Sequence, residues 1–165
     1  MTQRREFYME NSHVQINNMA LYCIYKLAPE QIVLELQGDA VIKEYRTKSP
    51  DWDWGEMRGG TQPISHKGLW LRFFHSSTRN NKSAWGWNYY LGALLMENTP
   101  PFQIVAVSKF PILAGTERYF PVTRWKPRVI FPAGAIKTEN GFVVSVGLND
   151  AATARVTLTE QDLNL

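Results

Sequence analysis

Short apolar runs separated by turn residues make up most of this sequence. The runs are rich in aromatic and β-branched residues, and Gly, Pro, Asn or Asp lies between them. This pattern is typical of β-strands joined by tight turns. Strands are expected at residues 19–26, 32–36, 68–75, 87–96, 102–107, 129–136, 142–146 and 153–158.

Helical periodicity is nearly absent. The apolar run 91–96 is compatible with one helical turn, but the neighbouring Tyr90 and Gly92 favour a strand. Asn140 and Gly141 lie between two apolar runs and predict a β-hairpin, because a type I′ turn needs positive φ at both central residues. Two segments containing Gly, Pro and Trp are expected to be long connections: residues 44–62 and 114–128.

The strands recur as meanders, which leaves a sandwich, a barrel and a β-propeller open as architectures. A propeller blade has about four strands and spans roughly 40 to 50 residues. The chain of 165 residues therefore has room for three to four blades. The same length suits one domain with its own core, because two domains would each have too few residues to bury a hydrophobic core.

Aromatic residues form 13% of the chain. This high aromatic content is explained either by a β-rich core or by a surface on which flat ligands stack. Eighteen Lys and Arg against fifteen Asp and Glu give a net charge of +3, and the longest basic cluster is Arg4-Arg5, so no nucleic-acid partner is expected. The single cysteine, Cys23, excludes an intramolecular disulfide and is interpreted as a small buried hydrophobe.

Targeting and cofactor motifs are not visible. The N-terminus lacks the apolar core of a secretory signal and no run approaches a membrane span, which favours a soluble cytoplasmic protein without a membrane partner. The sequence holds no P-loop, GxGxxG, HExxH, GxSxG or CxxC pattern. Nucleotide and zinc hydrolase chemistry therefore lack support, and neither a cofactor nor a metal is expected.

Several motifs follow one another in a characteristic order. A Gly- and Pro-rich segment leads into an apolar strand that ends in a histidine, and four further motifs come after it: residues 58–64, 68–75, 90–95, 101–102 with 108–113, 129–134 and 147–150. Their order and spacing resemble the C-terminal part of glycoside hydrolase family 130, the five-bladed β-propellers of β-mannoside phosphorylases and mannosidases. The resemblance covers roughly residues 9–160 and only the later blades. It implies an all-β chain, a partial β-propeller of about three antiparallel four-stranded blades, forming a single domain over residues 1–165.

The resemblance also implies site residues. Arg58, beside two glycines, is suited to an anionic or polyhydroxy ligand, the alternative being a surface arginine on a turn. The resemblance implies that His75 helps to bind phosphate or water at one side of the site. It implies that Asp150 accepts a hydrogen bond from a sugar hydroxyl. A purely structural histidine and a local turn are the alternatives. The remaining candidate substrate-binding residues are Tyr90, Asn149 and Trp54.

The most unusual local composition alternates carboxylates with indoles. Asp51, Trp52, Asp53 and Trp54 are followed by Glu56. Aromatic faces stack on sugar rings and carboxylates accept from their hydroxyls, so this segment suits a sugar site. It is equally explained as a loop whose tryptophans cover a blade. The segment Trp85-Gly86-Trp87 has the same two interpretations, with core packing favoured for Trp87.

The sequence departs from the family at two functional positions. Met9-Glu10-Asn11 stands where the family has a phosphate-binding lysine, and the general-acid aspartate of the family belongs to an earlier blade, so no catalytic residue is assigned here. One hypothesis is a truncated or shortened phosphorylase or glycosidase, acting on β-mannosides by hydrolysis or by glycosyl transfer to inorganic phosphate. The alternative is a non-catalytic carbohydrate-binding or protein-interaction domain. Open sheet edges also predict self-association.

Overall fold

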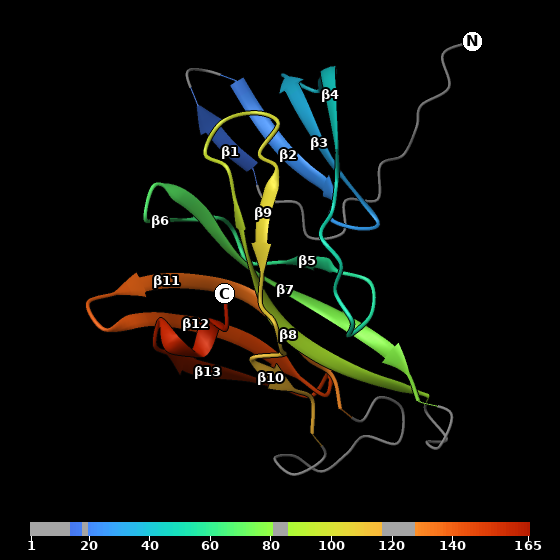
Figure 1. The fold of residues 1–165 in the computed structure, drawn as a ribbon, viewed down its shortest axis with the longest axis vertical. Coiled ribbons are helices and arrows are strands. Elements are labelled where there is room, and N and C mark those ends of the chain that lie inside the picture. The colour runs from blue at the N-terminus through green and yellow to red at the C-terminus, as the bar shows by residue number, and fades with distance from the viewer. Residues whose placement is uncertain (1–13, 18–19, 81–85, 117–127) are drawn as a thin grey trace.

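The computed structural model describes residues 14–17, 20–80, 86–116 and 128–165 of the chain (Figure 1). Three antiparallel sheets and one short 3-10 helix, Gln161–Leu163, make up this part of the protein. The first sheet has the order β1-β2-β3-β4. Its strands are β1 (Val14–Asn17), β2 (Ala20–Lys26), β3 (Glu30–Gln37) and β4 (Ala40–Lys48).

The second sheet follows the path β10-β8-β7-β5, with β6 also paired to β7 and β9 also paired to β8. Its strands are β5 (Arg58–Gly60), β6 (Ile64–His66), β7 (Leu69–Arg79), β8 (Trp87–Met96), β9 (Ile104–Val107) and β10 (Leu113–Ala114). The third sheet has the order β11-β12-β13. Its strands are β11 (Ile130–Thr138), β12 (Gly141–Leu148) and β13 (Ala152–Leu158).

The second sheet lies between the other two (Figure 1). Leu71 and Phe73 of β7 pack with residues of the third sheet such as Phe142, whereas Phe74, which points to the opposite face, packs with residues of the first sheet such as Val33. Successive side chains of a strand alternate between faces, so the central strand β7 must be apolar on both. Burying one such side chain fully contributes about 1.5–3 kcal/mol. Two core clusters of the described residues therefore lie one on each side of the second sheet, and a third, smaller one is formed by Cys23, Ile32 and Leu34 of the first sheet.

The prediction of an all-β chain with antiparallel sheets is confirmed. The second sheet has a main path of four strands plus two short ones, and the third has three strands in the described part of the chain. Residues 91–96 belong to strand β8 rather than to a helix, and Cys23 is buried, both as expected. No helix in the described ranges is long and apolar enough to cross a membrane.

Strand β4 was not predicted, because residues 44–62 were expected to be irregular. Only Tyr45 and Thr47 of this edge strand are partly buried, and the remainder is exposed. Its sequence therefore lacks the apolar alternation by which a strand is recognised. Within this segment the chain is irregular between Lys48 and Arg58, where the short strand β5 begins, so the prediction also missed β5. Of the second predicted connection, residues 117–127 lie outside the described residues.

The hairpin predicted around Asn140 joins β11 to β12, but its turn differs from the prediction. Thr138 pairs with Gly141, so the loop residues are Glu139 and Asn140, and Asn140 does not have the positive φ of a type I′ turn. Gly141 has φ +141°, and a Cβ there would lie 2.0 Å from the carbonyl oxygen of Leu158. The glycine is required by the close approach of β13, not by the turn.

Candidate functional site

Arg58 and His75 lie opposite each other on β5 and β7. The register shifts between Arg58 and Gly60, and His75 Nδ1 lies 2.7 Å from the carbonyl oxygen of Gly59 in this bulge. Because that carbonyl can only accept, the proton of a neutral His75 ring is on Nδ1. A Cβ at Gly60 would lie 2.1 Å from the carbonyl oxygen of Phe73. The glycine therefore lets β5 approach β7, and His75 holds the bulge next to Arg58.

The segment after the bulge is anchored to β7 by Thr61. Its backbone N–H donates to the Phe73 carbonyl at 2.9 Å, and its hydroxyl accepts from the Phe73 N–H at 3.1 Å. Buried Arg72 donates from Nε to the Thr61 carbonyl at 2.8 Å. Burial lowers the pKa of Arg72 to about 10, so the side chain still carries its charge at neutral pH. The chain that follows Arg58 thus has several hydrogen bonds to the central strand.

The His75 ring faces the third sheet. Its centroid lies 4.8 Å from the Phe131 ring, and it stacks on Tyr89 at 6.3 Å with an interplanar angle of 17°. The side chain is 8% exposed. His75 is therefore enclosed by aromatic rings, which fits a positioning role as well as a binding one.

Tyr90 and Trp54 meet on the opposite face of the second sheet. Their rings pack edge to face at 5.2 Å, and the Tyr90 hydroxyl lies 3.2 Å from Thr78 Oγ1. Alternation along β8 places Tyr89 and Tyr90 on different faces, as the sequence predicted. The structure therefore brings Trp54 and Tyr90 together and separates them from the His75 ring.

Asn149 and Asp150 form the tight turn between β12 and β13. Both have positive φ, 53° and 51°, and the turn is closed by a 3.0 Å hydrogen bond from Ala151 N–H to the Leu148 carbonyl. Asp150 is exposed, whereas Asn149 is 1% exposed. Aspartate and asparagine tolerate this left-handed backbone better than other side chains do.

The buried side chain of Asn149 forms hydrogen bonds with the backbone of neighbouring segments. Its Oδ1 accepts from the Val129 N–H at 2.9 Å, and its Nδ2 donates to the Thr116 carbonyl at 3.1 Å. Its backbone N–H also donates to the Val129 carbonyl at 3.0 Å. These bonds tie the β12–β13 turn to the chain that enters β11, which is a structural role for Asn149.

The loop that carries the alternating carboxylates and indoles is seated on β7 by one serine. Ser76 Oγ accepts from Trp52 Nε1 at 2.8 Å and donates to the Trp54 carbonyl at 2.8 Å. The Trp52 ring packs edge to face on Phe74 at 5.1 Å. Gly55 has φ +98°, and a Cβ there would lie 2.1 Å from the Ser77 carbonyl oxygen. The tryptophans of this loop therefore cover the second sheet.

Trp87 was expected to pack in the core, and this expectation is wrong. The side chain is 44% exposed at the first residue of β8. Its strand neighbour Arg79 is exposed as well, so the paired ends of β7 and β8 extend beyond the packed sheets. Trp85 lies outside the described residues.

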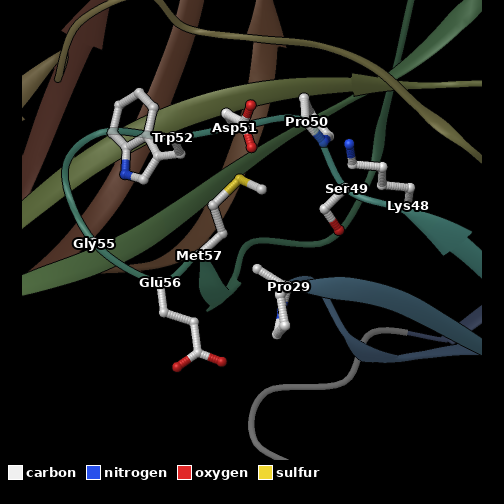
Figure 2. A pocket seen from close by; sticks show the side chains of 10 residues that line it. Pro29, Lys48, Ser49, Pro50, Asp51, Trp52, Gly55, Glu56 and Met57 are labelled. Carbon is white, nitrogen blue, oxygen red and sulfur yellow. The ribbon is translucent and has the colours of Figure 1, made fainter.

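A pocket of about 510 Å³ separates this loop from the turn that joins β2 to β3 (Figure 2). The Ser49 hydroxyl donates to the Leu27 carbonyl and so ties the far side of the pocket to that turn. Figure 2 shows the Met57 side chain between Trp52 and Pro29, with the Glu56 carboxylate pointing away from Trp52. The lining residues are Ala28, Pro29, Lys48, Ser49, Pro50, Asp51, Trp52, Gly55, Glu56 and Met57.

A second pocket of about 250 Å³ adjoins the first and reaches Arg58. Its lining residues are Tyr25, Lys26, Leu27, Ala28, Glu56, Met57, Arg58 and Gly59. The two pockets share Ala28, Glu56 and Met57, and we call them together the 28–58 groove. Sequence reasoning singled out Arg58 and the carboxylates but missed Met57, Lys48 and the β2–β3 turn. No local pattern marks these residues, because they meet only where two sheets approach.

The 28–58 groove combines both charges with an apolar floor. Lys26, Lys48 and Arg58 offer donors, and Asp51 and Glu56 offer acceptors. Met57, at 2% exposure, forms part of the apolar floor. A sugar ring carries hydroxyls that both donate and accept around apolar C–H faces, and this combination of groups can bind all of them.

No family model and no curated protein matches this sequence. Among solved structures, the fold is similar to that of the β-1,2-mannobiose phosphorylase of Listeria innocua in complex with β-1,2-mannobiose. That likeness has a TM-score of 0.70 at 17% identity and covers 93% of this chain and 45% of the phosphorylase. A candidate glycoside hydrolase from Parabacteroides distasonis matches with a TM-score of 0.58 at 13% identity, over 88% of this chain and 48% of the other.

The chain spans slightly less than half the length of each of these two proteins. At such identities the likeness establishes a fold and not an activity. The fold is all-β, built of three antiparallel sheets, and similar to part of a glycosidase-type β-propeller. This agrees with the architecture that the sequence resemblance implied.

Proposed function

We propose that this chain is a carbohydrate-active protein that binds a β-mannoside in the 28–58 groove, beside Arg58. The observation that carries the proposal is the lining of the groove by donors, acceptors and an apolar floor within a glycosidase-type fold. The phosphorylase of similar fold is described as a complex with β-1,2-mannobiose, which makes that disaccharide the first ligand to test.

Arg58 is the residue we assign to ligand binding at the inner end of the groove. Its guanidinium offers several N–H donors in a fixed plane, and Lys26 lines the same 250 Å³ pocket. Two cations at one end also suit an inorganic phosphate. His75 holds the Gly59 bulge through its 2.7 Å contact and so acts on Arg58 as a positioning residue.

The other candidate residues have more distant roles in this proposal. Trp54 and Tyr90 stabilise the loop that forms one wall of the groove, through their 5.2 Å ring contact. Asn149 shapes the β12–β13 turn, on which Asp150 is the exposed candidate for accepting a sugar hydroxyl. Neither residue lines the 28–58 groove.

Titration calorimetry with β-1,2-mannobiose, with and without phosphate, tests the proposal. We expect binding by the wild-type chain and roughly 10- to 100-fold weaker binding by Arg58→Ala, since a lost hydrogen bond to a charged group costs about 1.5–3 kcal/mol. Lys109→Ala, an exposed cation outside both pockets, is the control and is expected to bind like wild type. Absence of binding to mannobiose and to other glycans overturns the proposal.

The proposed sugar binding is compatible with two classes of function. One is a phosphorylase or glycosidase, and the other is a non-catalytic carbohydrate-binding domain. Chromatography of the same incubations separates them, because only an enzyme releases mannose or mannose 1-phosphate. The binding domain is the second candidate because the donors, acceptors and apolar floor of the groove suffice to bind a sugar without reacting with it. Product release by the purified chain would reject it.

A further inference from the structure

The two ends of the 28–58 groove differ in chemistry. The end beside Arg58 is lined by two cations, Arg58 and Lys26, and by Gly59, which has no side chain to cover its backbone. The end beside Trp52 has two prolines, Pro29 and Pro50, together with two carboxylates and one amine. Apolar rings of proline and tryptophan suit the C–H faces of a sugar, whereas the Arg58 end suits its hydroxyls or a phosphate. The groove therefore presents two different contact regions in series.

The volumes of the two ends also differ. The pocket at Arg58 has about 250 Å³, and the pocket at Trp52 has about 510 Å³. Pockets that enclose drug-sized ligands begin at about 300 Å³. The Arg58 end is thus suited to a single sugar ring, and the Trp52 end has room for further rings. The buried residues Ala28 and Met57 line both pockets, so the two ends adjoin each other.

Both walls of the larger pocket are held by buried hydrogen bonds. On the loop side, Ser76 binds Trp52 and the Trp54 carbonyl, and Gly55 lies directly against Ser77. On the first-sheet side, the buried Ser49 hydroxyl donates to the Leu27 carbonyl. A pocket formed in advance of binding avoids much of the entropic cost of ordering its side chains.

We infer that the Trp52 end is an additional sugar-binding subsite, so that the groove takes neutral oligosaccharides longer than a disaccharide. The inference rests on the proposed function, since it assumes that the Arg58 end binds a sugar unit. In the additional subsite, Asp51 accepts from sugar hydroxyls and Lys48 donates to them. The carboxylates of Asp51 and Glu56 outnumber the single amine of Lys48 at this end, which favours a neutral polyhydroxy ligand over an anionic one.

Asp51→Asn tests the subsite, and the same loop supplies a matched control. Asp51 and Asp53 are both exposed carboxylates, but only Asp51 lines the groove. Asp53→Asn therefore makes the same charge change without touching the subsite. The ligands are β-1,2-linked manno-oligosaccharides of two, three and four units, measured by titration calorimetry on the full chain, with circular dichroism to verify folding of each variant.

For the wild type, affinity is expected to rise about tenfold from two units to four, which corresponds to one added hydrogen bond to a charged group. Asp51→Asn is expected to lose most of this gain while binding the disaccharide as before. Arg58→Ala should weaken all lengths alike, and Asp53→Asn should change none. These results would show that the two ends of the groove contribute separately to binding.

Three outcomes overturn the inference. Affinity independent of length would show that the Trp52 end makes no contact with the ligand. Equal weakening of all lengths by Asp51→Asn, or the same loss in Asp53→Asn, would show only a general charge effect. If no oligosaccharide binds at any length, the proposed function fails and the subsite fails with it, whereas length-independent binding leaves the proposed function standing.

Discussion

Trp52 donates its indole N–H to the hydroxyl of Ser76 at 2.8 Å, and the same hydroxyl donates to the carbonyl of Trp54. One fully buried side chain of β7 thus satisfies two groups of the loop that lines the 28–58 groove. The loop has no regular secondary structure of its own, so its conformation depends on this contact with the second sheet.

Ser76→Ala should therefore destabilise the fold by about 1–3 kcal/mol, because the Trp52 N–H and the Trp54 carbonyl lose their partner. Urea unfolding followed by tryptophan fluorescence measures the change. Ser65→Ala removes an exposed hydroxyl from β6 and is expected to be nearly neutral. Equal stability of the two variants would contradict the anchoring role of Ser76.

Gly55→Ala should be more destabilising than Gly38→Ala. Both glycines have positive φ, 98° and 58°, which costs alanine about 1–2 kcal/mol. At Gly55 the added Cβ would also lie 2.1 Å from the Ser77 carbonyl oxygen, whereas nothing lies within 4 Å at Gly38. The clash adds about 1–3 kcal/mol, measurable by the same urea titration. A smaller loss at Gly55 than at Gly38 would show that the loop is not pressed against β7.

Asn149→Gly separates a structural role from a binding role. Glycine keeps the φ of 53° but loses the bonds to Val129 and Thr116, so the free energy of unfolding should fall by about 1–3 kcal/mol. Asp150→Gly, one residue later in the same turn, changes an exposed side chain and should cost less. Thermal unfolding followed by circular dichroism compares the two. A stable Asn149→Gly variant with weakened glycan binding would instead favour the role that the family resemblance implied.

His66 should make the protein less stable as the pH falls below about 6.5, the ordinary pKa of histidine. Burial lowers the pKa of His66 most; Lys67 and Lys137 lower it further, and Glu160 opposes them. The unfolded chain thus binds a proton that the folded chain does not, which favours unfolding as the pH falls toward the lowered pKa. The ring packs on Phe142 at 5.4 Å, so His66→Phe preserves that contact. Urea unfolding at pH 7.5 and 5.5 should show a smaller loss for His66→Phe than for wild type; equal losses would refute the assignment.

Self-association through an open sheet edge stays a prediction, and β4 offers the place to test it. This outer strand of the first sheet exposes Val41 at 42% and Ile42 at 54%. Replacing both by threonine should lower the mean mass measured by light scattering, because less apolar surface is offered at the edge. Phe110→Ser removes an even more exposed apolar side chain, at 62%, outside any strand and serves as the control. A wild-type chain that is monomeric at high concentration would reject the prediction.

Regular strands were predictable from the sequence where one or both faces are buried. The apolar, aromatic-rich runs 68–75 and 87–96 predicted β7 and β8, and the alternation of side chains along a strand placed Tyr89 and Tyr90 on opposite faces. Strand β4 was not visible, since an exposed edge strand does not need apolar alternation. The glycines at positions 60 and 141 were recognised as special, but the chain segments that approach them are remote in sequence.

The candidate site was predicted only in its parts. Arg58, His75 and the carboxylates of the 51–56 segment were identified by type and order, yet their relative positions were not. His75 lies against Phe131, more than fifty residues away, and Trp54 meets Tyr90 across a loop and a strand. Such contacts depend on which sheets pack together and on the register of their strands. That arrangement is set by the burial of the whole core and not by any local pattern.

The sequence by itself thus determined the all-β class, most strands and the kinds of side chain available for binding a sugar, because these follow from local alternation and composition. Tertiary structure decided that the Asn149 side chain is bonded to Val129 and Thr116, that the tryptophans of the 51–56 segment cover the second sheet, and that Met57 and Lys48 line a groove. The physical reason is that hydrogen-bond partners and pocket walls come from separate sheets, and only the packing of those sheets brings them within contact distance.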